Sequence, residues 1–147
     1  MLEYPWRDPA QPRRRVRLVS ASLTRGADMR CQAEVCLEWE GVEYRGKQDG
    51  VGRAAIEHRV AAEATLKALR LLLRADARFR LIGTKSVKAF DDNVAIVALA
   101  LDERENGPER HVIGAALAED HDVVRGMARA VLNATNRILG NFLHAAD

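Results

Sequence analysis

The sequence predicts an α+β fold made of two βββα units related by a pseudo-two-fold internal repeat, with both helices packed on one face of an antiparallel sheet. Two observations predict it. Three strand-like segments and a long amphipathic helix occupy residues 16–75, and the same order recurs over residues 79–143. Neither unit alone buries enough apolar surface to offset the entropy of ordering it. Since 147 residues is also a usual size for one domain, we expect residues 16–147 to share a single core.

Residues 1–15 predict a basic arm that lies outside this domain. Prolines interrupt the segment, and its arginines outnumber its acids. Such an arm could contact nucleic acid or anionic lipid, or it could be a poorly ordered terminus; the prolines favour the second interpretation.

The first unit opens with a strand over residues 16–23 and a loop that contains Gly26 and Asp28. A hairpin around Glu40-Gly41 follows. If these two residues form the tight turn, Trp39 faces Val42 and Leu37 faces Tyr44, so the large apolar side chains share one side of the hairpin. A helix is expected to begin near Arg53 or Ala54, with a charged stripe opposite an alanine and leucine face.

The second unit contains an unusually apolar strand. Residues 79–90 predict a strand that ends at Asp91-Asp92-Asn93, and residues 94–101 then contain no polar side chain. A strand of this kind needs cover on both faces, and the helices can cover only one. We therefore expect a homodimer, or a larger assembly, with Val97, Leu99 and Leu101 in the interface. The alternative is that the strand is central and enclosed on both faces by its own chain.

A turn at Asn106-Gly107-Pro108 leads to the last strand, over residues 111–118. Asp120 or Asp122 is the expected N-cap of the final helix. That helix repeats the design of the first, with small and aliphatic side chains on one face and Arg125, Arg129, Asn133 and Arg137 on the other.

The sequence predicts no enzyme, no cofactor and no metal site. It contains no phosphate-binding loop, and its four histidines are scattered. Cys31 and Cys36 lie five positions apart in a strand, hence on opposite faces, and suit small buried side chains better than a disulfide or zinc site. The net charge of +2 argues against nucleic acid as a general partner. No apolar run is long enough to span a bilayer, so we expect a cytoplasmic protein without membrane partners.

The two strand-to-helix junctions are the candidate ligand sites. A helix N-terminus offers free backbone amides, and glycines allow a ligand to approach the main chain. The first junction, with Asp49, Gly50, Gly52 and Arg53, suits a small carboxylate or phosphate. The second, with Glu119, Asp120 and Asp122, suits an ammonium group. Helix capping is the competing interpretation of both.

Several motifs together resemble the C-terminal regulatory domain of 2-isopropylmalate synthase. They are the two βββα units, the glycine turn before the first helix, Gly114-Ala115-Ala116 followed by Glu119-Asp120, and the segment from Ala130 to Leu139. The resemblance implies a domain of paired units that dimerises and binds an end-product amino acid. The glycine-rich loop before the first helix reads Gly50-Val51-Gly52-Arg53-Ala54-Ala55 here, without the proline and acid of that family. The resemblance therefore implies the fold and the dimer more than leucine recognition.

The first half alone is also similar to a double-stranded RNA-binding domain. The likeness rests on Gly26-Ala27-Asp28-Met29, the hairpin over residues 33–46, and Ala61-Ala62 with Ala68-Leu69. It implies phosphate contacts by Arg53, His58 and Arg59.

Together these observations predict a non-catalytic regulatory or accessory domain that binds a small amino acid or organic acid. The alternatives are a protein-interaction or structural module and a module that binds double-stranded RNA.

Overall fold

The computed structural model describes residues 15–73, 77–103, 109–119 and 122–138. The basic arm up to residue 14, the turn at residues 106–108, Asp120 and the end of the second unit lie outside these ranges. The elements, in chain order, are β1 (Arg17–Arg25), the 3-10 turn η3 (Ala27–Met29), β2 (Arg30–Trp39), β3 (Val42–Val51), α1 (Ala54–Arg70), β4 (Ala77–Ala89), β5 (Asp92–Glu103), β6 (Arg110–Ala118) and α2 (Val123–Thr135).

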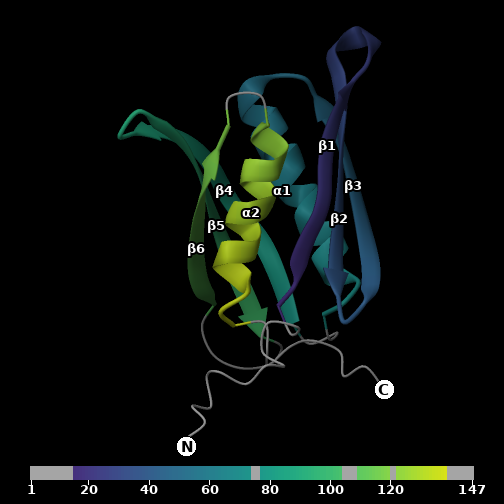
Figure 1. Cartoon of the computed structure of the whole chain (residues 1–147), viewed down its shortest axis with the longest axis vertical. Helices are drawn as coiled ribbons and strands as arrows, with labels where there is room; N and C mark the ends of the chain where they lie inside the picture. The colour runs from purple at the N-terminus through teal and green to yellow at the C-terminus, as the bar shows by residue number, and fades with distance from the viewer. Residues whose placement is uncertain (1–14, 74–76, 104–108, 120–121, 139–147) are drawn as a thin grey trace, which may run out of the picture.

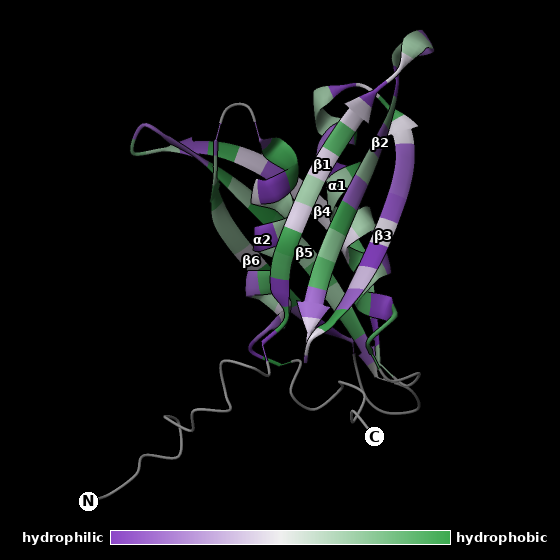
Figure 2. Cartoon of the chain, turned by 45° about the vertical axis from the view of Figure 1, so that its right-hand side comes forward, coloured by the Kyte–Doolittle hydropathy of each residue, from purple (hydrophilic) through white to green (hydrophobic). Residues whose placement is uncertain are grey.

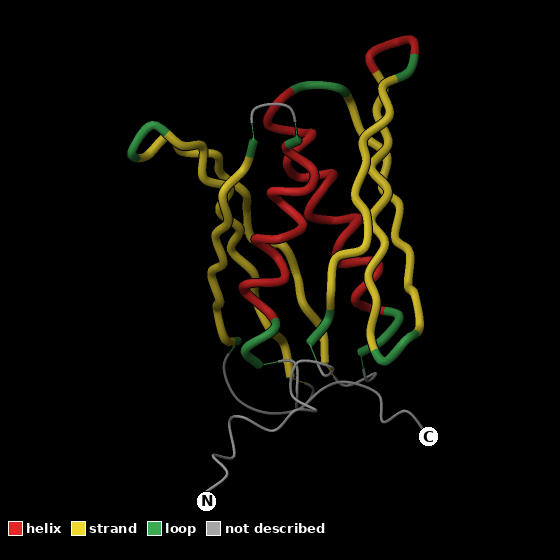
Figure 3. Tube along the Cα trace, in the orientation of Figure 1, coloured by secondary structure: helices red, strands yellow, loops and turns green. Residues whose placement is uncertain are grey.

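The strands form two antiparallel three-stranded sheets, in the order β1-β2-β3 and β4-β5-β6. The strand order is thus the same in both units. The two helices lie between the two sheets, which corrects the expectation of one sheet with both helices on a single face (Figures 1 and 3). Each helix packs on its own sheet and also reaches the first strand of the other unit: α1 contacts β2, β3 and β4, and α2 contacts β5, β6 and β1. A helix with small apolar side chains on more than one side can be buried in this way.

The predicted β2–β3 hairpin is confirmed. Trp39 pairs with Val42, and Leu37 pairs with Tyr44. Glu40 and Gly41 both have positive φ, 54° and 80°, as a type I′ turn requires. The alternation of apolar and polar side chains and the two-residue turn specify the same register, which is why the sequence predicts it well.

The two units repeat the same close contact between the third strand and the helix. A Cβ atom built at Gly46 would overlap the carbonyl oxygen of Ala64, and one built at Gly114 would overlap that of Ala130. Each first strand also carries an irregularity in the same place, at Val19 in β1 and at Ile82 in β4.

Most of the buried apolar side chains of both units belong to one cluster. A further link joins the start of β1 to the end of α2: the Asn136 side chain accepts a hydrogen bond from the Val16 amide (3.1 Å) and donates one to the Val16 carbonyl (3.2 Å). The first strand of one unit is therefore held by the last helix of the other.

The expected dimer residues of β5 lie inside this core. Val97, Leu99 and Leu101 are fully buried, on the face of β5 that meets the helices. They are not available to a second molecule, so the assignment of these three residues to an interface is corrected. The sequence could not show which face is covered, because both faces of this strand are apolar.

Candidate ligand-binding site

The second strand-to-helix junction contains a cavity of about 450 Å³, which we call the junction cavity. It lies where the β4–β5 turn, the end of β6 and the first turns of α2 meet. The residues that line it are Asp91, Asp92, Asn93, Leu117, Ala118, Glu119, Asp122, Arg125, Gly126 and Arg129. Its volume is within the range of small-molecule sites. Glu119 and Asp122, two of the three acids predicted here, line it.

Asp122 has the capping role expected of it. Its carboxylate accepts a hydrogen bond from the Arg125 amide (3.1 Å) and one from the Arg125 guanidinium (3.3 Å). The cap satisfies a backbone donor at the start of α2 and neutralises Arg125 locally. Asp122 and Arg125 are therefore bound to each other in the lining of the cavity. A ligand would have to pair with the other charged residues of the lining.

The remaining charges of the junction cavity have both signs. Asp91, Asp92 and Glu119 supply carboxylates, and Arg129 supplies a guanidinium. None of these four side chains forms an ion pair with another residue in the part of the chain that the structure describes. Ala118, which faces Gly126 of α2, adds an apolar contact to the lining. This arrangement suits a small molecule with an ammonium group and a carboxylate.

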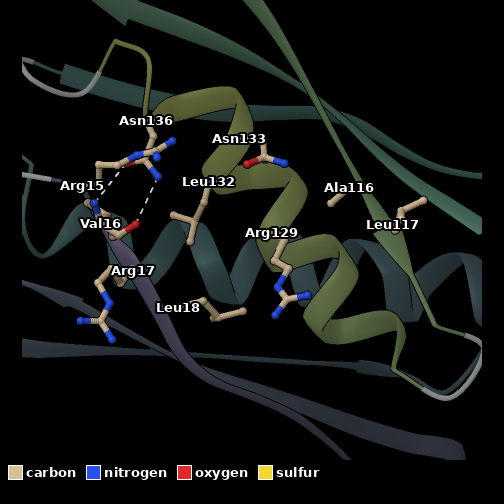
Figure 4. A pocket seen from close by; sticks show the side chains of 10 residues that line it. All are labelled: Arg15, Val16, Arg17, Leu18, Ala116, Leu117, Arg129, Leu132, Asn133 and Asn136. Atoms are coloured by element: carbon tan, nitrogen blue, oxygen red, sulfur yellow. Dashed lines mark hydrogen bonds between the residues drawn. The ribbon is translucent and has the colours of Figure 1, made fainter. Parts of the chain in front are cut away.

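A second cavity, of about 680 Å³, adjoins the first and shares Leu117 and Arg129 with it. It lies along α2 between the start of β1 and β6 (Figure 4). Its amide groups are already engaged, because Asn136 bonds to Val16 and Asn133 donates to the Ala115 carbonyl (2.7 Å). Arg129 extends from α2 toward β1 beside this space (Figure 4). It is thus placed at the boundary of the two cavities.

The first junction is filled by side chains. Gly50 points at α1, and a Cβ atom there would overlap Val60 and crowd Ile56. Asp49 is exposed on the opposite side and accepts a hydrogen bond from Gln32 (2.8 Å). Arg53 is the exposed N-cap residue of α1. These residues come from one segment but do not surround a common space.

The start of α1 also holds a carboxylate of its own. Glu57 is buried in the first turn, and a Cβ atom on Gly52 would lie 3.5 Å from its Oε2 atom. Arg25 of β1 donates two hydrogen bonds to it, at 2.8 and 2.7 Å. The favourable region for an anion at this helix N-terminus is therefore occupied by Glu57.

A difference in helix length explains why the junctions differ. If the matching contacts of Gly46 and Gly114 are aligned, Gly50 corresponds to Ala118 and Val60 to Gly126. On this alignment α1 begins three residues earlier than α2, and the additional turn carries Ile56 over Gly50. At the second junction, Gly126 packs closely on Ala118, and α2 begins only at Val123, after its N-cap Asp122. The space filled in the first unit is thus open in the second.

The residues expected to contact RNA differ in exposure and charge. Arg53 and Arg59 are exposed, but His58 between them is half-buried, and burial lowers its pKa below the ordinary 6.5. His58 is thus mainly neutral at neutral pH, and the charge of the adjacent, buried Glu57 is paired with Arg25.

Sequence reasoning missed Arg129, which it placed on the solvated stripe of the last helix. Asp91 and Asp92 were expected only in a turn. Their common location depends on the end of the β4–β5 hairpin lying beside the start of α2, and no spacing in the sequence encodes that distance. No local sequence pattern would have identified Arg129, Asp91 and Asp92 as parts of one site.

The described residues contain no group of three or more histidine, cysteine or acidic side chains that could hold a metal ion. Within the same ranges, none of the helices has the length and hydropathy needed to cross a membrane. Comparison with models of known protein families and with curated proteins finds no match for this chain.

Proposed function

We propose that this chain is a non-catalytic regulatory or accessory domain that binds a small amino acid in the junction cavity. The observation that carries the proposal is the presence of unpaired charges of both signs around one cavity of about 450 Å³. A purely structural cap would need only Asp122 and Arg125, which already satisfy each other.

The two ends of the ligand have different partners in this proposal. The ammonium group lies toward the carboxylates of Asp91, Asp92 and Glu119, and the carboxylate pairs with the guanidinium of Arg129. Arginine suits this role because its planar group binds a carboxylate through two parallel hydrogen bonds. The ligand side chain lies against Ala118. An organic acid without an ammonium group would use Arg129 alone and bind more weakly.

A thermal-shift screen of the common amino acids and small organic acids tests the proposal. An amino acid at about one hundred times its dissociation constant stabilises the folded protein by about 2.7 kcal/mol. For a chain of this size the melting temperature then rises by roughly 5–10 °C. The variant Arg129→Met should lose this shift, because methionine keeps the apolar stem and removes the charge.

Arg59→Met is the matched control, since Arg59 is also an exposed helical arginine but lies on α1, away from the cavity. It should retain the shift. The proposal is wrong if no compound in the screen raises the melting temperature, or if Arg129→Met binds the identified ligand as well as the unmodified protein does.

A further inference from the structure

The outer faces of the two sheets differ in character although the sheets have the same strand order. The face of β1–β3 that points away from the helices is polar (Figure 2 shows the largely hydrophilic β3). Its charges pair with one another: Arg17 lies 3.3 Å from Glu38, and Arg45 lies 3.6 Å from Glu34 and 3.5 Å from Glu43. This face is suited to contact with water.

The corresponding face of β4–β6 is apolar. We define the β4–β6 outer face as the side chains opposite to the buried Val97 and Leu99, namely Ile82, Val87, Val94, Ile96, Ala98, Ile113, Ala115 and Leu117. The register places these residues in adjacent rows across three strands, and Ile113 and Leu117 are 61% and 65% exposed. Both helices lie on the other side of the sheet, so they leave this face uncovered. A continuous apolar patch of this kind indicates an interaction surface.

The charges around the face favour a neutral partner. At one end Arg80 pairs with Glu109 at 2.7 Å, and His111 lies 3.4 Å from the same carboxylate. Three rows of paired residues across β4, β5 and β6 contain most of the apolar side chains. Among the residues that the structure describes, Lys85 of the edge strand β4 is the only cation in these rows. The face therefore offers neither the cluster of cations that a nucleic acid or an anionic membrane needs nor a cluster of acids.

At the centre of the face, the pattern of side-chain sizes on β5 and β6 is self-complementary. In neighbouring rows, Ile96 stands beside Ala115, and Ala98 stands beside Ile113. Large side chains thus occupy one diagonal and small ones the other. A second copy of the face, turned by a two-fold axis in the plane of contact, can place its large side chains over the small ones, as facing sheets do when they pack about 10 Å apart.

We propose that the β4–β6 outer face is the surface through which two copies of this chain form a homodimer, sheet against sheet. The interface uses Val94, Ile96 and Ala98 of β5. Along this strand they alternate with the buried residues, among them Val97 and Leu99, which the sequence analysis assigned to the interface. This proposal is independent of the junction cavity, since it depends on a different set of observations.

Sedimentation over a wide range of concentrations tests the homodimer. The unmodified chain should sediment as a dimer, and its melting temperature should rise with protein concentration because dissociation accompanies unfolding. Ile113→Arg buries an unpaired charge in the interface, so we expect its dissociation constant to rise by at least about tenfold. Its thermal unfolding at low concentration should match that of the unmodified monomer.

Two irregular positions provide a matched pair of variants. Ile82 and Val19 interrupt the first strand of their units at the same place, and both side chains are 41% exposed. Ile82→Arg should weaken the dimer, whereas Val19→Arg should leave it unchanged. If Ile113→Arg fails to fold, Ile113→Thr keeps the preference for a strand and should still weaken association.

The proposal is overturned if the unmodified chain is monomeric at every concentration. It is equally overturned if a dimer forms but the folded Ile113 and Ile82 variants associate as tightly as Val19→Arg does.

Discussion

Glu57 and Arg25 show how one residue pair joins two elements of the first unit. The Glu57 carboxylate is buried, and a buried charge is costly unless it is paired and hydrogen-bonded. Arg25 forms two hydrogen bonds with it, and this interaction raises the pKa of Arg25 further above its ordinary value. The pair holds the end of β1 against the first turn of α1. It also excludes an anionic ligand from that helix N-terminus.

His58, the next residue, should make stability depend on pH. Burial lowers its pKa below 6.5 in the folded protein, so the unfolded chain binds more protons as the pH falls below that value. The contribution to stability is complete above pH 6.5 and is lost as the pH falls through the folded pKa. Urea unfolding of His58→Gln should therefore show a smaller loss of stability between neutral pH and about one unit below 6.5.

Glu109 does not contribute to the change of stability in that pH range. Hydrogen bonds from Arg80 and His111 lower its pKa below 4.5, so its contribution is lost only under more acidic conditions. An equal loss of stability in His58→Gln and in the unmodified protein would show that His58 is not the group responsible.

At the scale of elements, the distance between each helix and its third strand depends on one glycine. Gly46 and Gly114 leave no room for a Cβ atom against the helix backbone. The facing alanines of α1 and α2 permit the same close approach from the other side. This packing brings α2 to β6 and so positions Arg129 beside the end of the strand.

We expect Gly114→Ala to destabilise the protein by about 1–3 kcal/mol, because the new methyl group forces α2 away from β6. Gly83→Ala in β4 is the control, since no atom lies within 4 Å of the position that its Cβ would take. Its effect should be within about 0.5 kcal/mol. Urea unfolding measures both, and similar stabilities of the two variants would contradict the packing argument.

At the scale of the whole molecule, the helices are shared between the two sheets. Each helix contacts the first strand of the other unit, and Asn136 binds the backbone of Val16 across the same boundary. The apolar cluster is therefore common to both units. Separation of the units would expose one side of each helix to water.

Neither half should fold alone. A fragment of residues 1–75 and a fragment of residues 76–147 should each show little secondary structure by circular dichroism, while an equimolar mixture should regain part of it. The fragments lack the contacts that cover the second side of each helix. A cooperative thermal transition in either isolated fragment would contradict this prediction.

The sequence by itself determined the order of the elements, the β2–β3 register and the start of α1. These depend on side-chain periodicity and on turn residues such as Gly41, which act over a few positions. The tertiary structure alone decided that the helices lie between two sheets and that Arg129 meets Asp91, Asp92 and Glu119 at one cavity. It also decided that Val97, Leu99 and Leu101 face inward, because a strand that is apolar on both sides has no alternation to tell its faces apart.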